Sequence, residues 1–571
     1  MQVNDPQNLA FYWSTLFVRT LYEEGVRNVV ISPGSRSTPL TLAFSAHPGF
    51  HKTIAIDERS AAFIALGQAK ALGKPSVLVC TSGTALANYA PAIFEATNSG
   101  IPMIIASADR PPHLRGVGAS QTIDQLKIFG DQTVYFHDAG EPSSHFQKLK
   151  RIETAAKQSY FYSTSQSGVA HINFPFNKPL EPDAEFLHEI EDENSRHVRR
   201  TNTDYNLEQG DTTLGEKFWS QLVSSERPVI VVGPLNKHQE IPFILPLAKI
   251  LKAPVLAEPG SNIPNSKHLI SGYAGFLRND DIRDGLTPDL IIRFGAAPIT
   301  KAGQTFLEAN SDAIQIHFTH STIWQDGDVA PVKHIPIPAN LQIPDITGAA
   351  QSTWLKSWKK VEKNFKLYRE GEIKPSTPLT DGYVFTSLTK LLPKKHFTML
   401  SNSFPVRDMA LFGNYYDKEL YVNRGAAGID GIISTTIGLS QVLDKAGVLF
   451  IGDIAFLHDA NALLSKEYIN RPLVIILLNN GGGTIFRMLP VYKLKEKHRT
   501  YFETPQSVRI VSLCRAYSVA HTLVTRPEQL ITAFELAIEK NGIQVIECLT
   551  DADDSMLERH KLWNFSDGAF L

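Results

Sequence analysis

Polar residues follow two apolar stretches late in the chain, and their types are those that bind metal ions. Asp453 ends "VLFIGD", and Asn480 ends the next stretch, "LVIILLNN", just before three glycines. If the stretches are neighbouring parallel strands, both side chains lie at the sheet edge where open α/β sheets bind ligands. A carboxylate, an amide oxygen and a backbone carbonyl suit Mg²⁺, which completes its shell with water and phosphate. Taken alone, the pattern fits a metal–phosphate site and a plain turn equally well.

A second candidate acid lies early in the chain, within "AIDERSAAFIALGQAKALG". Asp57, Glu58 and Arg59 separate the strand-like "HKTIAI" from an alanine-rich helix pattern that we expect to be buried on several sides. Acids at such a junction usually cap the helix or interact with its dipole. The alternative is a poorly solvated acid with a chemical role, and this stretch by itself favours the capping role.

The elements that must position these groups alternate along the chain as strand and helix patterns. Continuous apolar runs of this length are typical of strands buried on both faces, as in parallel sheets covered by helices. The clearest, besides the two above, are "RNVVIS", "SVLVCT", "PMIIAS", "PVIVVG" and "DLIIRFG". We therefore expect an α/β protein built from doubly wound parallel-sheet domains.

Two stretches of different composition divide the chain into three α/β units. Residues 183–213 are polar and charged, and residues 329–348 are rich in proline. Both are interpreted as linkers or surface crossings. The expected domains are residues 1–185, 213–345 and 375–571.

The first and third units share a pattern. Val77–Ser107 and Val448–Leu478 each predict a strand, a polar turn, a helix and a second strand, with Pro102 and Pro472 at almost the same offset. The plainer interpretation is that any two strand–helix–strand units look alike. The sharper one is a duplicated domain whose copies hold the two ends of one ligand.

Composition argues against several classes of protein. The chain has 571 residues, of which 43% are hydrophobic and 20% charged, as in a multidomain globular protein. Lys plus Arg is 56 and Asp plus Glu is 58, so a net charge of −2 gives no sign of a nucleic-acid or membrane surface. Three scattered cysteines indicate a reducing compartment rather than a disulfide framework or zinc site. Without a signal-peptide pattern or an apolar run of about 20 residues, we expect a cytoplasmic protein with no transmembrane segment.

The stretch around Glu58 and the Asp453–Asn480 pattern together point to one family of enzymes. The chain resembles the thiamine diphosphate enzymes, in which a pyrimidine-binding domain supplies a glutamate and a related diphosphate-binding domain carries Gly-Asp…Asn-Asn. Glu58 matches that glutamate, and Asp453, Asn480 and Gly482 match the metal ligands. The resemblance implies thiamine diphosphate and Mg²⁺ or Mn²⁺ as cofactors. One departure is Ile454, where the family usually has glycine after the aspartate.

The resemblance also gives the three expected domains their roles. Residues 1–185 would be the pyrimidine-binding domain with the catalytic glutamate, residues 213–345 a central α/β domain, and residues 375–571 the diphosphate- and Mg-binding domain. The central unit has no G-x-G-x-x-G motif, so neither NAD nor FAD is implied. In the family, the glutamate domain of one subunit faces the diphosphate domain of its partner. A homodimer or homotetramer with active sites at the subunit interface is therefore expected.

Among these enzymes, the whole chain is similar to the 2-succinyl-5-enolpyruvyl-6-hydroxy-3-cyclohexene-1-carboxylate synthases of menaquinone biosynthesis. These transferases decarboxylate 2-oxoglutarate and add the resulting succinyl semialdehyde carbanion to isochorismate. The motifs that carry the resemblance are "ISPGSRSTPL" (31–40), "IDERSAAFIALG" (56–67), "TSGTALANYAPAIFEA" (81–96), "SADRPPHLRGVGASQTIDQ" (107–125), "SNSFPVRD" (401–408) and "NRGAAGIDGIISTTIG" (423–438).

The resemblance implies a role for each matching residue. Glu58 would be the catalytic group, hydrogen-bonded to N1′ of the cofactor's aminopyrimidine, and Ile429 would be the wedge that bends the cofactor. The other cofactor-binding positions, besides the three metal ligands, are Ser82, Gly83, Ser403, Gly431, Ile485 and Phe486. The substrate-binding positions are Ser35, Arg36, Arg110, Gln121, Lys301, Arg407, Arg424, Ile485, Phe486 and Leu489. Ser120 stands where related enzymes often have asparagine, which leaves one isochorismate contact open.

Three alternatives compete with this interpretation. The first is another thiamine diphosphate carboligase or decarboxylase that acts on pyruvate, such as acetolactate synthase. Its site would have no need of five cations, whereas both substrates named above are dianions that suit planar, bidentate arginine. The second is a catalytically inactive subunit of the same fold, and the third a nucleotide-binding α/β protein without the cofactor. Glu58, Asp453 and Asn480 together argue against the second, and missing phosphate-loop signatures argue against the third.

Overall fold

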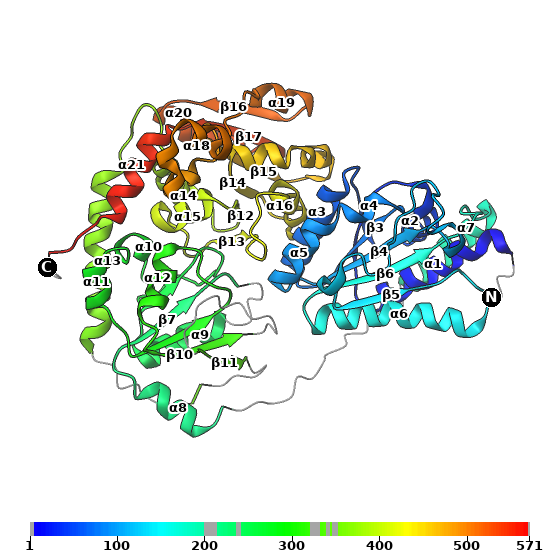
Figure 1. The fold of residues 1–571 in the computed structure, drawn as a ribbon, viewed down its shortest axis with the longest axis horizontal. Coiled ribbons are helices and arrows are strands. Elements are labelled where there is room, and N and C mark those ends of the chain that lie inside the picture. Colours follow the sequence, from blue (N-terminus) through cyan, green and yellow to red (C-terminus); the bar gives the residue numbers. More distant parts are fainter. Residues whose placement is uncertain are drawn as a thin grey trace. The chain divides into compact units, whose positions relative to one another are not determined.

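The structure, a computed structural model, describes residues 5–198, 214–235, 241–319, 332–337, 343–344 and 352–568. Within these residues the strands form three sheets, and neighbouring strands pair in parallel (Figure 1). Helices flank each sheet, as such buried strands require. The expectation of an α/β protein with three doubly wound parallel sheets is confirmed.

The first and third sheets have the same strand order. The first contains β1 (Asn28–Ile31), β2 (His51–Ile54), β3 (Ser76–Cys80), β4 (Met103–Asp109), β5 (Tyr135–Asp138) and β6 (Val169–Pro175), in the order β2-β1-β3-β4-β6-β5. The third contains β12 (Phe397–Leu400), β13 (Glu419–Val422), β14 (Gly447–Gly452), β15 (Pro472–Asn479), β16 (Ala520–Val524) and β17 (Gly542–Leu549), in the order β13-β12-β14-β15-β17-β16. The two segments that look alike in sequence thus occupy equivalent strands, which favours the duplication.

The central sheet has a related but shorter arrangement. Its strands are β7 (Pro228–Val232), β8 (Val255–Ala257), β9 (Leu290–Phe294), β10 (Ile314–Thr319) and β11 (Val332–Pro336), in the order β11-β10-β9-β7-β8. In all three sheets the strand order reverses next to the first strand, and ligands of doubly wound folds bind at such a point.

The longer helices occupy the connections between strands. They are α1 (Pro6–Glu23), α2 (Thr38–Ser45), α3 (Glu58–Leu72), α5 (Ala90–Ser99), α6 (Phe146–Ser165), α7 (Ala184–Val198), α8 (Glu216–Val223), α9 (Ile241–Leu251), α12 (Lys301–Ala309), α13 (Ser352–Glu372), α14 (Asp381–Leu391), α15 (Phe404–Phe412), α16 (Ile432–Leu443), α20 (Pro527–Ile538) and α21 (Ala552–Trp563). Shorter ones include α4 (Thr84–Ala87), α10 (Tyr273–Phe276), α11 (Asp280–Gly285), α17 (Asp453–His458), α18 (Glu496–His498) and α19 (Ile510–Ala516).

The chain forms two compact units. Unit 1 comprises the described residues of Met1–Leu207 together with Gly425–Asp444 and His458–Asn470. Unit 2 comprises the described residues of Glu208–Arg424, Lys445–Leu457 and Arg471–Leu571. Helix α16 therefore belongs to the unit that contains the first sheet, although it lies between strands of the third sheet in sequence.

The core of unit 1 is the apolar face of α1 and α2 packed on the first sheet. Phe11, Phe17 and Leu21 of α1 are fully buried, and Phe17 meets Phe174 of β6 edge to face, with ring centroids 5.0 Å apart. Asp5 caps the helix by accepting the backbone N–H of Gln7. Burial of such aromatic side chains is the main stabilising term for this layer.

Both expected linkers contain regular structure, which corrects the sequence-based expectation. Residues 184–198 form α7, because a few apolar side chains among the charges reach the core. Ile190 is fully buried, and the Phe186 ring meets Phe11 edge to face. In the second stretch, Val332–Pro336 forms β11 and extends the central sheet beside β10. Residues 199–213, and most of the other positions of these two stretches, lie outside the described residues.

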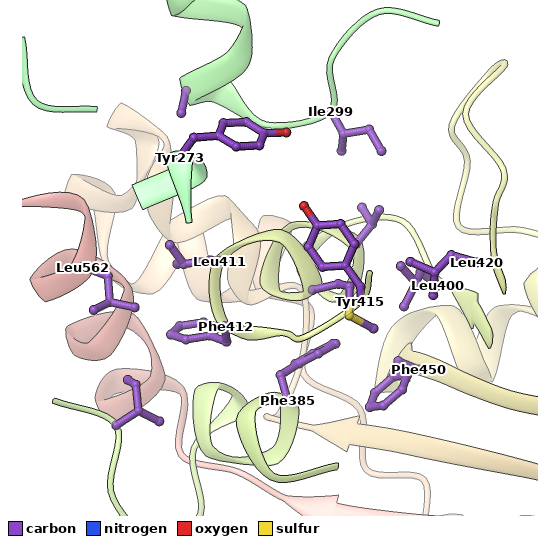
Figure 2. Close-up of a cluster of buried hydrophobic side chains, with 14 of the residues drawn as sticks. Tyr273, Ile299, Phe385, Leu400, Leu411, Phe412, Tyr415, Leu420, Phe450 and Leu562 are labelled. Carbon is purple, nitrogen blue, oxygen red and sulfur yellow. The ribbon is translucent and has the colours of Figure 1, made fainter. Parts of the chain in front are cut away.

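One continuous core joins the central and third sheets within unit 2 (Figure 2). Phe412, the last residue of α15, and Tyr415, three residues beyond it, lie among Phe385, Leu411 and Leu562. The Tyr415 hydroxyl also donates to the carbonyl oxygen of Ala257, at 2.7 Å. The hydroxyl is thus satisfied in the apolar interior, and it ties α15 to the edge of β8.

Two further observations bear on the class of protein. In the described residues, no helix is both long and apolar enough to cross a membrane. Cys80, Cys514 and Cys548 are buried, unpaired thiols.

Acid is expected to weaken unit 1 through His171 of β6. This side chain is fully buried against the rings of Phe129 and Phe136, and its Nε2 lies 2.7 Å from the hydroxyl of Ser107. Burial lowers the pKa of His171 to about 3, whereas an unfolded chain protonates histidine near pH ~6.5. Because the unfolded state takes up the proton first, the free energy of unfolding falls below pH ~6.5, by at most about 1.4 kcal/mol per pH unit.

Urea unfolding of the wild type and of His171→Gln, between about pH 7 and pH 5, checks this prediction. The variant lacks the proton-linked loss, so its stability should fall less steeply than that of the wild type. His51→Gln, at an exposed position of β2, is the matched control and should follow the wild type. Equal slopes for His171→Gln and the wild type would contradict the prediction.

Candidate active site

The charged triplet before α3 divides into two structural residues and one available acid. Asp57 is the N-cap, and its Oδ1 accepts the backbone N–H groups of Arg59 and Ser60 at 2.9 and 3.2 Å. Its Oδ2 accepts from Nδ2 of Asn461 at 3.0 Å. Arg59 donates to the carbonyl oxygen of His458 at 2.8 Å. The capping role that the sequence favoured therefore belongs to Asp57.

Glu58 differs from both neighbours. In the part of the chain that the structure describes, its carboxylate has no hydrogen bond or ion pair with another residue. Its negative charge acts on Cys80, the last residue of β3, and on the buried hydroxyl of Tyr89. The side chain is half-buried, not buried as a poorly solvated acid would be. Glu58 is thus a carboxylate available to a ligand near the end of β3.

Two glycines bring α3 and α16 into direct backbone contact. A Cβ at Gly67 would lie 2.1 Å from the carbonyl oxygen of Thr435, and one at Gly438 would lie 2.1 Å from that of Ile64. Gly431, before α16, has φ +65°, and a Cβ there would lie 2.0 Å from the Phe63 ring. Ile429, in the preceding turn, is partly exposed, so it is no ordinary core residue. The structure therefore places Glu58 and the Ile429–Gly431 turn on helices that pack together.

The other predicted residues of unit 1 gather at the ends of β1, β3 and β4. The Ser82 hydroxyl donates to the carbonyl oxygen of Gln121 at 3.0 Å, and the Gly83 backbone approaches the same carbonyl group. Arg110 donates from NH2 to Oε1 of Gln121 at 3.5 Å. Ser35, on the turn after β1, is exposed.

Arg36 and Arg110 form a cationic pair in this region. Arg36 is 5% exposed and donates from NH1 to the carbonyl oxygen of Phe176 at 2.8 Å. Burial, and then the like charge of Arg110, lowers the pKa of Arg36. In the described residues, Nε of both arginines is buried without a hydrogen-bond partner. Buried donors normally have a partner, so this pair fits an anionic ligand such as a carboxylate.

A buried polar network that sequence reasoning missed supports these residues. Gln125 is fully buried, its Oε1 accepts the backbone N–H of Gly83 at 2.9 Å, and its Nε2 donates to Asn173 at 3.0 Å. Asn173 donates in turn to Asp109 at 2.9 Å, and Asp109 accepts the backbone N–H of Arg110 at 2.7 Å. The only signal in the sequence was that Asp109 and Gln125 lie within the motif at 107–125.

In unit 2, the three predicted metal ligands lie at the carboxyl ends of β14 and β15. Asp453 is 6% exposed and accepts the backbone N–H of Ile454 at 2.9 Å. Burial raises the pKa of Asp453 to about 6, while hydrogen bonds from the backbone of Ile454 and Gly482 oppose the shift. Among the described residues it has no ion pair. A buried carboxylate that has no ion pair with the described residues is a suitable ligand for a cation.

The amide of Asn480 is oriented by another buried group that sequence reasoning missed. Its Nδ2 donates to Asp381 at 3.2 Å, which leaves Oδ1 as the oxygen available to a metal. Asp381 also accepts from NH2 of Arg559 at 2.7 Å, and Arg559 donates from Nε to Asp408 at 2.9 Å. No motif singled out Asp381 or Arg559, since they become neighbours of Asn480 only in the folded chain.

The glycine turn after Asn480 is shaped by close backbone contact. Gly482 has φ +133°, and a Cβ there would lie 2.3 Å from the carbonyl oxygen of Glu503. Gly483 donates its backbone N–H to the same carbonyl oxygen at 2.7 Å. Beyond the turn, Ile485 is partly exposed, and Phe486 and Leu489 are exposed, so these apolar residues are not simple core.

The remaining predicted residues of unit 2 are Ser403, Arg407, Arg424 and Lys301. Arg407 donates from NH1 to the carbonyl oxygen of Ser403 at 2.7 Å, and Ser403 has φ +72° before α15. Burial lowers the pKa of Arg407, and the buried Glu258 acts on both Arg407 and Arg424. The ammonium of Lys301 is exposed and lies 3.4 Å from Glu308, while the preceding residue, Thr300, donates its hydroxyl to Glu258 at 2.6 Å. Glu258 is a third residue that the sequence gave no reason to single out.

The donor set decides which cation could bind. Among the described residues there is no group of three or more His, Cys, Asp or Glu side chains that could hold a metal. One carboxylate, one amide oxygen and one backbone carbonyl remain, which leaves positions for water and phosphate oxygens. Such a set suits Mg²⁺ or Mn²⁺ and does not suit a zinc site.

Gly482→Ala is expected to destabilise unit 2 by about 1–3 kcal/mol, because φ is positive and the new Cβ would collide with a backbone carbonyl. Gly452→Ala is the matched control, since a Cβ there meets nothing within 4 Å. Its effect should stay within about 0.5 kcal/mol. Thermal unfolding followed by circular dichroism measures both, and equal midpoints for the two variants would refute the prediction.

Similarity to known proteins identifies the family of the chain. Residues 13–128 match the thiamine pyrophosphate enzyme, N-terminal TPP binding domain, and residues 409–548 match the C-terminal TPP binding domain. The chain is 35% identical to the 2-succinyl-5-enolpyruvyl-6-hydroxy-3-cyclohexene-1-carboxylate synthase of Bacillus velezensis, over 94% of each chain. It is also 35% identical to that of Haloarcula marismortui, over 97% of this chain and 98% of the relative. The chain therefore belongs to the 2-succinyl-5-enolpyruvyl-6-hydroxy-3-cyclohexene-1-carboxylate synthase family of thiamine pyrophosphate enzymes.

Proposed function

We propose that this chain is a transferase of menaquinone biosynthesis. It decarboxylates 2-oxoglutarate with thiamine diphosphate and transfers the four-carbon unit to isochorismate, giving 2-succinyl-5-enolpyruvyl-6-hydroxy-3-cyclohexene-1-carboxylate. One observation carries the proposal. The first and third sheets have the same strand order, and the candidate groups for the two ends of the cofactor follow strands of these two sheets. Glu58 follows β2 of the first sheet, at the start of α3, and Asp453, Asn480 and Gly482 follow β14 and β15 of the third.

Thiamine diphosphate, when bound, supplies the electron sink for the charge left by loss of CO₂. Glu58 would form a hydrogen bond with N1′ of the aminopyrimidine and exchange a proton with it, and its free carboxylate supports that role. Ile429 would support the bent cofactor with a partly exposed apolar side chain. Ser82, Gly83, Ser403 and Gly431 are the other proposed contacts, and each lies at or near the carboxyl end of a strand or the start of a helix.

Asp453, Oδ1 of Asn480 and the carbonyl oxygen of Gly482 would hold Mg²⁺ or Mn²⁺. The fit rests on a buried carboxylate without an ion pair in the described chain and on an amide whose nitrogen is already engaged. Phosphate oxygens and water would complete the octahedral shell.

The cationic groups support dianionic substrates. Arg36 and Arg110 in unit 1, and Arg407 and Arg424 in unit 2, would pair with carboxylates of 2-oxoglutarate and isochorismate. Gln121 and Ser35 would add polar contacts, and the side chains of Ile485, Phe486 and Leu489 an apolar surface. Lys301 would have to leave Glu308 before it could pair with a substrate carboxylate.

We also propose that the enzyme is a homodimer or homotetramer with active sites at the subunit interface, as the family pattern implies. Its three buried, unpaired cysteines are those expected of a protein in a reducing compartment such as the cytoplasm.

The reaction itself is tested with purified protein, Mg²⁺, thiamine diphosphate and isochorismate. We expect consumption of 2-oxoglutarate, dependent on both cofactors, and little turnover of pyruvate, which has only one carboxylate. Consumption of pyruvate in place of 2-oxoglutarate would favour an acetolactate synthase-like enzyme. If neither keto acid is consumed although the cofactor raises the melting temperature, the inactive-subunit alternative would hold.

Glu58→Gln is expected to lower kcat by about 10²–10⁴-fold, because glutamine cannot act as the acid–base partner of the aminopyrimidine. The fold and the thermal shift caused by cofactor should both persist. Glu185→Gln, an exposed acid in the first turn of α7, is the matched control and should leave kcat unchanged. Turnover of Glu58→Gln near that of the wild type would remove Glu58 from the mechanism.

A further inference from the structure

A buried carboxylate far away in the sequence holds the turn that leads into α16. Glu95 of α5 is 2% exposed and belongs, like the turn, to unit 1. Its Oε1 accepts the backbone N–H of Gly425 at 2.9 Å. Its Oε2 accepts those of Ala426 and Ala427 at 2.8 and 3.1 Å. Three successive amides thus converge on one carboxylate.

The surroundings of Glu95 complete its hydrogen bonding and balance its charge. The Ser99 hydroxyl donates to Oε1 at 2.9 Å, so the carboxylate accepts four hydrogen bonds and is fully satisfied. Lys70 of α3 is also buried; burial lowers the pKa of Lys70, and the charge of Glu95 opposes that shift. A buried carboxylate is tolerated only with such compensation.

The backbone of the turn is shaped for this carboxylate. Successive N–H groups that point at one anion form a nest, in which residues alternate between right- and left-handed conformations. Ala427 has φ +59°, which is uncommon for a residue other than glycine. At Gly425, a Cβ would lie 2.4 Å from the carbonyl oxygen of Glu95, so only glycine allows the approach.

We propose that Glu95 is a positioning residue, and that its carboxylate fills the nest at Gly425–Ala427 and so fixes where Ile429 stands. The turn is held at its first end by Glu95 and at its second end by the contact of Gly431 with Phe63. Ile429 lies between these two anchors. The inference rests on the proposed function, in which Ile429 bends the cofactor.

The first test needs no cofactor and no substrate. In Glu95→Gln, one acceptor oxygen becomes an NH₂ group that faces backbone N–H donors, so the nest loses much of its attraction. We expect the amides of residues 425–427 to exchange with deuterium at least about tenfold faster than in the wild type. Glu153→Gln on α6 is the matched control, because its carboxylate pairs with Lys150 at the surface, and its exchange should match the wild type.

The second test measures the cofactor. A mobile Ile429 should weaken binding of thiamine diphosphate with Mg²⁺ by about tenfold in a fluorescence titration, and should lower kcat at saturating cofactor. The KM for 2-oxoglutarate should change by less than about threefold, since no substrate arginine is touched. A purely structural loss would instead leave the affinity and kcat of the folded fraction unchanged.

Gly425→Ala changes the turn instead of the carboxylate, because the new Cβ would push the backbone N–H groups away from Glu95. This variant tests the proposal if Glu95→Gln folds poorly. It should reproduce both the faster exchange and the weaker cofactor binding. Unchanged exchange at 425–427 in a folded variant would overturn the proposal, as would faster exchange with unaltered cofactor affinity and kcat. Failure of the wild type itself to bind thiamine diphosphate would instead refute the proposed function, and with it the role of Ile429, whatever the variants do.

Discussion

The crossing of α3 and α16 through Gly67 and Gly438 is the constraint on which the geometry of unit 1 depends. Each glycine lies against a carbonyl oxygen of the other helix, so any side chain there would push the helices apart. The close contact fixes the spacing of the two helices, whereas the turn before α16 is held by Glu95 and by the contact of Gly431 with Phe63. A helix pair spaced by larger side chains would leave Glu58 and Ile429 free to move separately.

Buried polar groups then carry the precision of the site. Gln125 and Asp109 join the turn after β3 to the residue that follows β4, and Glu95 joins α5 to the turn before α16. In unit 2, Asp381 accepts hydrogen bonds from both Asn480 and Arg559, and so joins the end of β15 to α21. Each of these groups would be costly to bury alone, and each is satisfied by several partners. Such networks are stable in one arrangement only, which is why they can hold ligand-facing groups without facing the ligand themselves.

The repeated strand order explains how a duplicated architecture can serve one cofactor. Parallel sheets bring the ends of several strands to one edge, and the side chains that follow those strands are free to differ between copies. After β3 the first copy carries Ser82 and Gly83, whereas after the equivalent β14 the third carries Asp453. The central sheet shares the architecture and joins the core of the third, and it adds the buried Glu258 near Arg407 and Arg424.

The sequence alone determined the parallel α/β class, the strands with continuous apolar runs, the likeness of the first and third units and the family, because apolar runs and motifs are local. It did not predict β11, which lies in a proline-rich stretch. Residue type and spacing singled out Asp453 and Asn480 as candidate ligands, and the resemblance to the thiamine diphosphate enzymes gave Glu58 and Gly482 their proposed roles. The sequence pattern wrongly predicted a linker or surface crossing at residues 184–198, because only three apolar side chains among the described residues, Phe186, Leu187 and Ile190, pack this charged segment on the core. Only the tertiary structure showed that Asp57 caps α3, that α16 joins the first unit, and that Glu95, Gln125 and Asp381 form hydrogen bonds with Gly425, Gly83 and Asn480. Those roles depend on partners far away along the chain, and hydrogen bonds between distant segments leave no pattern in a single sequence.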